Sequence, residues 1–127
     1  MKNFHYSTNY DPPAPVVKIT LVTPTKNLQI GPLTALVDSG ADGTIIPIDY
    51  LRKINASPVA EKFIRGPWGE RHRVLLYLVN IQIGDMTLYG MEVAGDHELD
   101  EVVLGRDTLN QLRIMLDGLG ETVEVWE

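Results

Sequence analysis

The stretch Leu36-Val37-Asp38-Ser39-Gly40-Ala41 places one carboxylate on a glycine turn directly after an apolar segment, and the chain does not repeat it. Asp, Ser and Gly all favour turns, so the stretch has an ordinary structural interpretation. The functional interpretation is a general base, which must be held rigidly beside hydrogen-bond donors. Gly40 lets the backbone double back without a Cβ clash, and Ser39 supplies a hydroxyl next to the acid. Asp38 is therefore the leading candidate for a catalytic group.

Alternating apolar residues on both sides of this stretch predict an all-β domain. Val17, Ile19 and Leu21 alternate with polar residues, which is typical of a half-buried strand. Further strands are expected over residues 28–30, 33–37, 44–46, 70–83, 86–93, 102–104, 114–116 and 122–125, a single helical turn over 49–54, and the best helix candidate over 108–112. Many short strands at close spacing indicate a closed or nearly closed barrel, here with one short helix near the C-terminus.

The chain is expected to contain one domain behind a short arm. Residues 1–15 are polar and end in the proline-rich run 11–15, so they are expected to form a loosely attached N-terminal arm. No low-complexity tract divides residues 16–127, which are expected to fold together. Within them, Gly31-Pro32 is expected to interrupt the second strand, and Gly84-Asp85 suits a tight hairpin.

Composition excludes several function classes. The 127 residues are 44% hydrophobic and 22% charged with a formal net charge of −6, and no cluster of Lys and Arg suggests a nucleic acid partner. The chain has no cysteine, which excludes disulfides and a thiol nucleophile. The N-terminus lacks the apolar core of a signal peptide, and the longest apolar run, 74–79, is too short to span a bilayer. A cytoplasmic protein without a membrane partner is expected.

A second motif follows later in the chain. Val103-Leu104-Gly105-Arg106-Asp107-Thr108-Leu109 runs from an apolar pair through a turn into the predicted helix, and so echoes the first motif. Together, the segment 35–44 and this segment resemble the two signatures of the retropepsins, the single-domain homodimeric aspartic proteases of retroviruses and their cellular relatives. The motifs stand in that family's order and at a comparable separation. The resemblance extends over residues 16–127 and, because of the tail, is closer to cellular and bacterial relatives than to viral enzymes.

This resemblance implies a retropepsin-like barrel that is active as a homodimer. It also implies that Asp38 is the catalytic aspartate, one from each subunit. Ser39 matches the position whose hydroxyl bonds across the dimer axis, and Asp42 and Arg106 match an acid and an arginine that pair in the family. The residues that the resemblance assigns to support of the active-site loop are Ser39, Gly40, Ala41, Asp42 and Arg106.

By the same resemblance, the turn Gly66-Pro67-Trp68-Gly69 occupies the place of the flap that closes over a bound peptide. Pro67 lacks an N–H group that could hold substrate, and the segment has fewer glycines than retroviral flaps. Trp68 has two possible roles, capping the substrate or packing on the partner's flap. Apolar residues at 37, 45, 46 and 103–104 are expected to line the specificity pockets.

The implied activity is that of an aspartic endopeptidase acting on peptides or proteins. Two carboxyl groups held about 3 Å apart cannot both ionise, so they share one proton and activate a water molecule. No cofactor is needed, and the scattered residues His5, His72 and His97 lack metal-ligand spacing. The alternatives are a catalytically weak or inactive retropepsin-like module that dimerises or binds peptides, and an unrelated β-barrel with a coincidental Asp-Ser-Gly.

Overall fold

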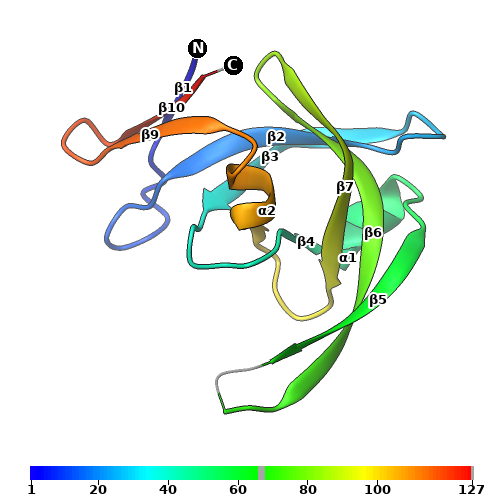
Figure 1. The fold of residues 1–127 in the computed structure, drawn as a ribbon. Coiled ribbons are helices and arrows are strands. Elements are labelled where there is room, and N and C mark those ends of the chain that lie inside the picture. The colour runs from blue at the N-terminus through cyan, green and yellow to red at the C-terminus, as the bar shows by residue number, and fades with distance from the viewer. Residues whose placement is uncertain (66–67, 127) are drawn as a thin grey trace.

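The computed structural model describes residues 1–65 and 68–126 as a mainly β structure (Figure 1). Its elements are β1 (Lys2–His5), β2 (Val16–Val22), β3 (Gln29–Val37), β4 (Ile45–Pro47), α1 (Ile48–Lys53), β5 (Pro58–Arg65), β6 (Arg71–Ile83), β7 (Met86–Asp96), β8 (Val102–Leu104), α2 (Arg106–Leu109), β9 (Arg113–Asp117) and β10 (Thr122–Trp126). The predicted all-β class is confirmed. Within the described ranges, no helix has the length and apolar character needed to cross a membrane.

Six strands close into a barrel. The large sheet has the order β2-β3-β8-β4-β7-β6-β5, and β2 pairs additionally with β6, which leaves β5 outside the closed part. The closing register places Leu21 opposite Ile81. Both side chains are fully buried, because alternate residues of a strand face the barrel interior. The alternation predicted for residues 17–21 is confirmed, with Lys18 exposed between buried Val17 and Ile19.

The two predicted helices are present with shifted bounds. Helix α1 covers Ile48–Lys53, one residue earlier than expected, and Leu51 and Ile54 bury their side chains in the core. Helix α2 begins at Arg106 and ends at Leu109, because its first hydrogen bonds are accepted by the carbonyl oxygens of Gly105 and Arg106. The expectation that this helix begins at residue 108 is therefore wrong by two residues.

Strand β3 is continuous through Gly31-Pro32, so the predicted interruption is wrong. Ile19 pairs with Leu33 and Leu21 with Ile30, and the register shift between the two pairs absorbs the irregularity. A Cβ atom on Gly31 would lie 2.6 Å from the Thr20 hydroxyl oxygen and 2.8 Å from its Cα atom. Glycine is needed here because the two backbones approach closely, and not because the strand ends.

The N-terminal arm is not loosely attached. Residues 2–5 form β1, which pairs with β10 in a separate sheet of order β1-β10-β9. Phe4 packs against the core, and a bridge between Ser7 and Ala14 closes the following loop. The proline-rich composition led to the wrong expectation, because the strand precedes the prolines and its partner lies at the other end of the chain.

Strands β5 and β6 form a long hairpin that reaches away from the barrel, on the side opposite to the chain termini (Figure 1). The inner part of β6 pairs also with β7 from Leu76 onward and with β2 at residues 80–82, whereas the outer part, residues 71–75, pairs with β5. In this outer part the Arg71 guanidinium lies 4.7 Å from the centre of the Phe63 ring, and Arg73 pairs with Glu61 at 2.7 Å. Residues Gly66 and Pro67 of the predicted flap lie outside the described residues.

Candidate active site

The loop that carries Asp38 begins where a parallel ladder ends. Strand β3 runs parallel to β8, with Leu36 opposite Val103 and Val37 opposite Leu104. The Asp38 backbone N–H then donates to the Leu104 carbonyl oxygen at 3.1 Å. Because this bond continues the ladder by one residue, the carboxylate sits immediately beyond a rigid strand pair.

Asp38 is held in a tight turn by its own neighbours. The Gly40 N–H donates to Asp38 Oδ1 at 3.0 Å, and the Ala41 N–H donates to the Asp38 carbonyl oxygen at 3.1 Å. A Cβ atom on Gly40 would lie 3.2 Å from Asp38 Oδ1, a contact tighter than most real Cβ atoms make. The side chain of Asp38 is half-buried, and its second oxygen has no hydrogen-bond partner among the described residues, so it can act on another group.

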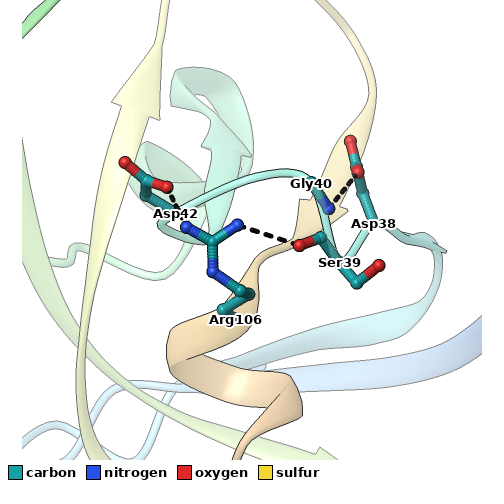
Figure 2. A network of polar contacts seen from close by, with 5 residues as sticks. All are labelled: Asp38, Ser39, Gly40, Asp42 and Arg106. Atoms are coloured by element: carbon teal, nitrogen blue, oxygen red, sulfur yellow. Dashed lines mark hydrogen bonds and ion pairs between the residues drawn. The ribbon is translucent and has the colours of Figure 1, made fainter.

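Arg106 braces this loop from helix α2. Its Nη1 donates to the Ser39 carbonyl oxygen at 2.9 Å, and its Nη2 pairs with the Asp42 carboxylate. The Arg106 backbone N–H also donates to the Ala41 carbonyl oxygen at 2.9 Å. Figure 2 shows the guanidinium between Asp42 and Ser39, with the Asp38 carboxylate pointing away from it. The structure therefore brings together the five residues assigned to loop support and Asp38.

A buried polar cluster, Thr44, Asp107 and Thr108, lies beneath the loop. The Thr44 hydroxyl donates to Asp107 Oδ1 at 2.7 Å and accepts the Gly105 N–H at 3.2 Å. It also lies 2.7 Å from the Thr108 hydroxyl, which must be the donor because the Thr44 proton is already used. Thr44 and Thr108 are 1% and 0% exposed and Asp107 is half-buried, so the two hydroxyl groups are shielded from water. The cluster joins the end of the loop to the start of α2.

The sequence did not identify this polar cluster. All three residues stand in the two quoted motifs. A threonine is an ordinary residue in a strand or a helix, and an aspartate at the position of Asp107 is common at the start of a helix. The available signal was that both motifs end in polar residues beside buried strands. It did not show that their side chains meet.

Backbone contact between the two motifs requires glycine. A Cβ atom on Gly105 would lie 2.4 Å from both the carbonyl carbon and oxygen of Gly43. No side chain larger than hydrogen fits there unless the loops separate. The loop 38–44 and the start of α2 are thus packed as one unit.

A protein-family model matches residues 26–111 of this chain, and its description is a gag-polyprotein putative aspartyl protease. The match spans both motifs. The chain belongs to this aspartyl protease family. No curated protein gives a significant match.

Solved structures share the fold of this family member at low sequence identity. A retropepsin-like aspartic protease from Rickettsia conorii matches with a TM-score of 0.62 at 14% identity, over 96% of this chain and 86% of its own. The EIAV protease in complex with an inhibitor matches with a TM-score of 0.57 at 20% identity, over 85% and 93%. The retroviral protease-like domain of Ddi1 from Leishmania major matches with a TM-score of 0.51 at 16% identity, over 87% of each chain. The retropepsin-like fold predicted from the two motifs is confirmed.

Trp68 and Gly69, the described part of the predicted flap, make no polar contact with the loop 38–44 within the described residues. Trp68 is 90% exposed, and its backbone N–H donates to Glu70 Oε2 at 3.0 Å. Glu70 Oε1 lies 3.4 Å from His72 Nε2, and Gly69 has a φ of +82°. Among the described residues, no hydrogen bond or ion pair joins Trp68 or Gly69 to residues 38–44.

Part of the expected specificity pocket is wrong. Ile46 and Leu104 are 0% exposed and belong to the barrel core, so neither side chain is available to line a substrate pocket. Val37 and Ile45 are half-buried, so their side chains can still line a substrate pocket. Over the described part of the chain, no group of three His, Asp or Glu side chains could hold a metal ion.

Proposed function

We propose that the chain is an aspartic endopeptidase that works as a homodimer, with Asp38 of each subunit forming the catalytic pair. The observation that carries this proposal is the geometry of the loop. A half-buried carboxylate with one committed oxygen stands on a turn braced by Arg106 and by the polar cluster. This is the preorganisation that a general base requires.

A second chain is needed because one chain supplies one such carboxylate. Within the described residues, no other carboxyl group contacts Asp38. Two surface pockets, of about 410 and 650 Å³, are lined by residues outside the 38–44 loop. Ser39 and Gly40 are exposed, so this loop is accessible to a partner. An isologous dimer would bring the two loops together across a two-fold axis.

The chemistry of such a pair follows from charge repulsion. Two carboxyl groups about 3 Å apart retain one proton between them over the acidic range. The ionised Asp38 accepts a proton from water as the water oxygen attacks the peptide carbonyl carbon. The protonated member, the partner subunit's Asp38, donates to the carbonyl oxygen. The tetrahedral intermediate then collapses, the C–N bond breaks, and the leaving nitrogen takes up the proton that water gave.

The supporting residues hold the loop, and with it the Asp38 carboxylate, in position in this mechanism. Arg106 holds the Ser39 carbonyl and the Asp42 carboxylate, which fixes the loop on either side of Gly40. Proton transfer needs donor and acceptor within about 3 Å, so a small displacement of the loop lowers the rate steeply.

The test is cleavage of a diverse peptide library by the purified protein between acidic and neutral pH, with Asp38→Asn as the variant. The expected loss in kcat/KM is roughly 10⁴-fold or more, as for other essential catalytic groups. Asn keeps an Oδ1 atom for the Gly40 N–H, so the fold is retained. Asp85→Asn, which changes an exposed acid in the β6–β7 turn, is the matched control and should leave activity unchanged.

A statine-type inhibitor, which mimics the tetrahedral intermediate, should block the activity. A peptide that binds equally to the wild-type protein and to Asp38→Asn, and is never cut, would instead identify a peptide-binding module. That result would contradict the proposed activity.

A further inference from the structure

Strand β6 runs from the barrel into the hairpin without losing its alternation. Val79 and Ile81 are 0% exposed, because they face the barrel interior. Both irregularities in the pairing of β6 place the extra residue in the partner strand, β5 or β7, and not in β6 itself. Tyr77, the next alternate residue toward the tip of the hairpin, packs against the core. The face of β6 that looks into the barrel therefore continues outward through residues 75, 73 and 71.

Strand β5 adds two residues to this face. Phe63 lies opposite Arg73, and Glu61 lies opposite Leu75. Directly opposite residues of an antiparallel pair lie on the same face of the sheet. The contacts of Arg71 with the Phe63 ring and of Arg73 with Glu61 agree with this assignment. We call the surface formed by these four side chains the inner face of the hairpin: Glu61, Phe63, Arg71 and Arg73.

The hairpin is basic, although the chain as a whole is acidic. Residues 61–73 contain four Lys or Arg residues and two Glu residues, whereas the formal net charge of the whole chain is −6. On the inner face, Glu61 offsets the charge of Arg73 at 2.7 Å. Arg71 is exposed and takes part in no ion pair among the described residues. Its charge is therefore available to a carboxylate from another molecule.

The guanidinium of Arg71 is already held in a position to bind. It lies 4.7 Å from the centre of the Phe63 ring, within the range of a cation–π contact. A guanidinium stacked on a ring keeps its N–H groups at its edge, where they can donate two parallel hydrogen bonds to a carboxylate. Phe63 is 53% exposed, so it also offers apolar surface beside the charge. This combination suits the side chain of a glutamate or an aspartate in an extended peptide.

We propose that Arg71, stacked on Phe63, binds a carboxylate side chain of the peptide substrate and so determines a specificity for acidic peptides. This inference rests on the proposed function, because it names the substrate class of that site. In the view of Figure 1, the hairpin curves below the loop that joins β3 to β4. A peptide that lies between this loop and the hairpin would meet the inner face on one side.

Peptide binding tests this specificity without any need for turnover. Matched fluorescent peptides differ only in carrying Glu or Lys at one position, which is scanned along the peptide, and fluorescence anisotropy gives their affinities for the Asp38→Asn variant. At one position we expect the Glu peptide to bind roughly tenfold more tightly than the Lys peptide. The ratio should fall at high salt, because salt screens an exposed ion pair.

Charge reversal on the two faces of the hairpin identifies the residue responsible. Arg71→Glu, made in the Asp38→Asn background, should reverse the preference, because it replaces attraction of the Glu peptide by repulsion. Lys62→Glu makes the same change of charge on the other face, since Lys62 is the exposed neighbour of Phe63 along β5. It should leave the preference unchanged. Equal effects of the two substitutions would show a general effect of net charge and would overturn the inference.

The outcomes separate this inference from the proposed activity. A Glu preference that Arg71→Glu reverses supports the inference even if the wild-type protein cuts no peptide, in which case the proposed endopeptidase activity fails alone. Cleavage by the wild-type protein with no preference for Glu over Lys at any position overturns the inference and leaves the proposed activity standing. A protein that neither binds nor cuts any of the peptides overturns both.

Discussion

The loop 38–44 and the β5–β6 hairpin are built on different principles. The loop is held by residues more than 60 positions away, through the Arg106 brace, the buried hydroxyl of Thr44 and backbone contact with Gly105. The outer part of the hairpin, β5 with residues 71–75 of β6, is held by pairs within itself, and Trp68 near its tip is 90% exposed. A catalytic carboxylate needs fixed geometry, whereas a segment that admits a peptide needs few contacts to break. The contrast teaches that side-chain bonds between distant residues hold the loop where the proposed chemistry requires rigidity, and that the outer hairpin has only neighbouring pairs.

The largest effect is expected where backbone meets backbone. Gly105→Ala places a Cβ atom 2.4 Å from the Gly43 backbone, so the two motifs must separate. We expect a loss of about 3 kcal/mol or more in the free energy of unfolding, measured by urea denaturation. Gly118→Ala, where nothing lies within 4 Å of the added Cβ, is the control. Equal, small effects in both variants would show that the loop is not packed rigidly.

The next effect is expected in the buried polar cluster. Thr44→Val keeps the shape but removes the hydroxyl, which leaves the Gly105 N–H and Asp107 Oδ1 each short of a partner. The expected cost is about 2–4 kcal/mol in unfolding free energy. Thr87→Val on β7 makes the same chemical change outside the cluster. If both variants lose the same stability, the cluster does not hold the loop.

The brace between Arg106 and Asp42 should matter more for rate than for stability. Their side chains are 47% and 84% exposed, so a double-mutant cycle with alanine should give a coupling of only about 0.5 kcal/mol in unfolding. Arg106→Lys loses the planar fork that reaches both Ser39 and Asp42, and kcat/KM should fall roughly 10- to 100-fold. Independent effects of the two alanine substitutions would remove the proposed pair.

The smallest effect is expected in the hairpin and depends on pH. Hydrogen bonds from its own backbone amide, from His72 and from the Trp68 backbone hold the pKa of Glu70 below its ordinary value of 4.5. A lowered pKa means that the local order is present above 4.5 and is lost as pH falls through the lowered value. In a Trp126→Phe background, Trp68 fluorescence should therefore change below pH 4.5, and Glu70→Gln should abolish that change. Global unfolding by urea should be the same in both proteins.

The same contrast explains what the sequence could predict. The Asp38 turn and the Gly105-Arg106 turn are local features, so their residue types indicated the structure, while the resemblance to a family supplied the predicted roles. The Thr44–Asp107 bond joins residues 63 positions apart, and nothing in either residue announces its partner. The pairing of β1 with β10 was not predicted for the same reason, because it joins strands at the two ends of the chain. The turns could be predicted from their residue types, whereas contacts between residues far apart in the sequence could not.

The account stands on the need for one Asp38 from each of two subunits. Mixing the wild-type protein with Asp38→Asn in equal amounts, after allowing the subunits to exchange, tests this need most directly. Random exchange leaves about a quarter of the dimers with two wild-type subunits, so activity at constant total protein should fall to about a quarter of the all-wild-type value. Activity that falls only to about one half would show that each subunit works alone, and would contradict the shared catalytic pair.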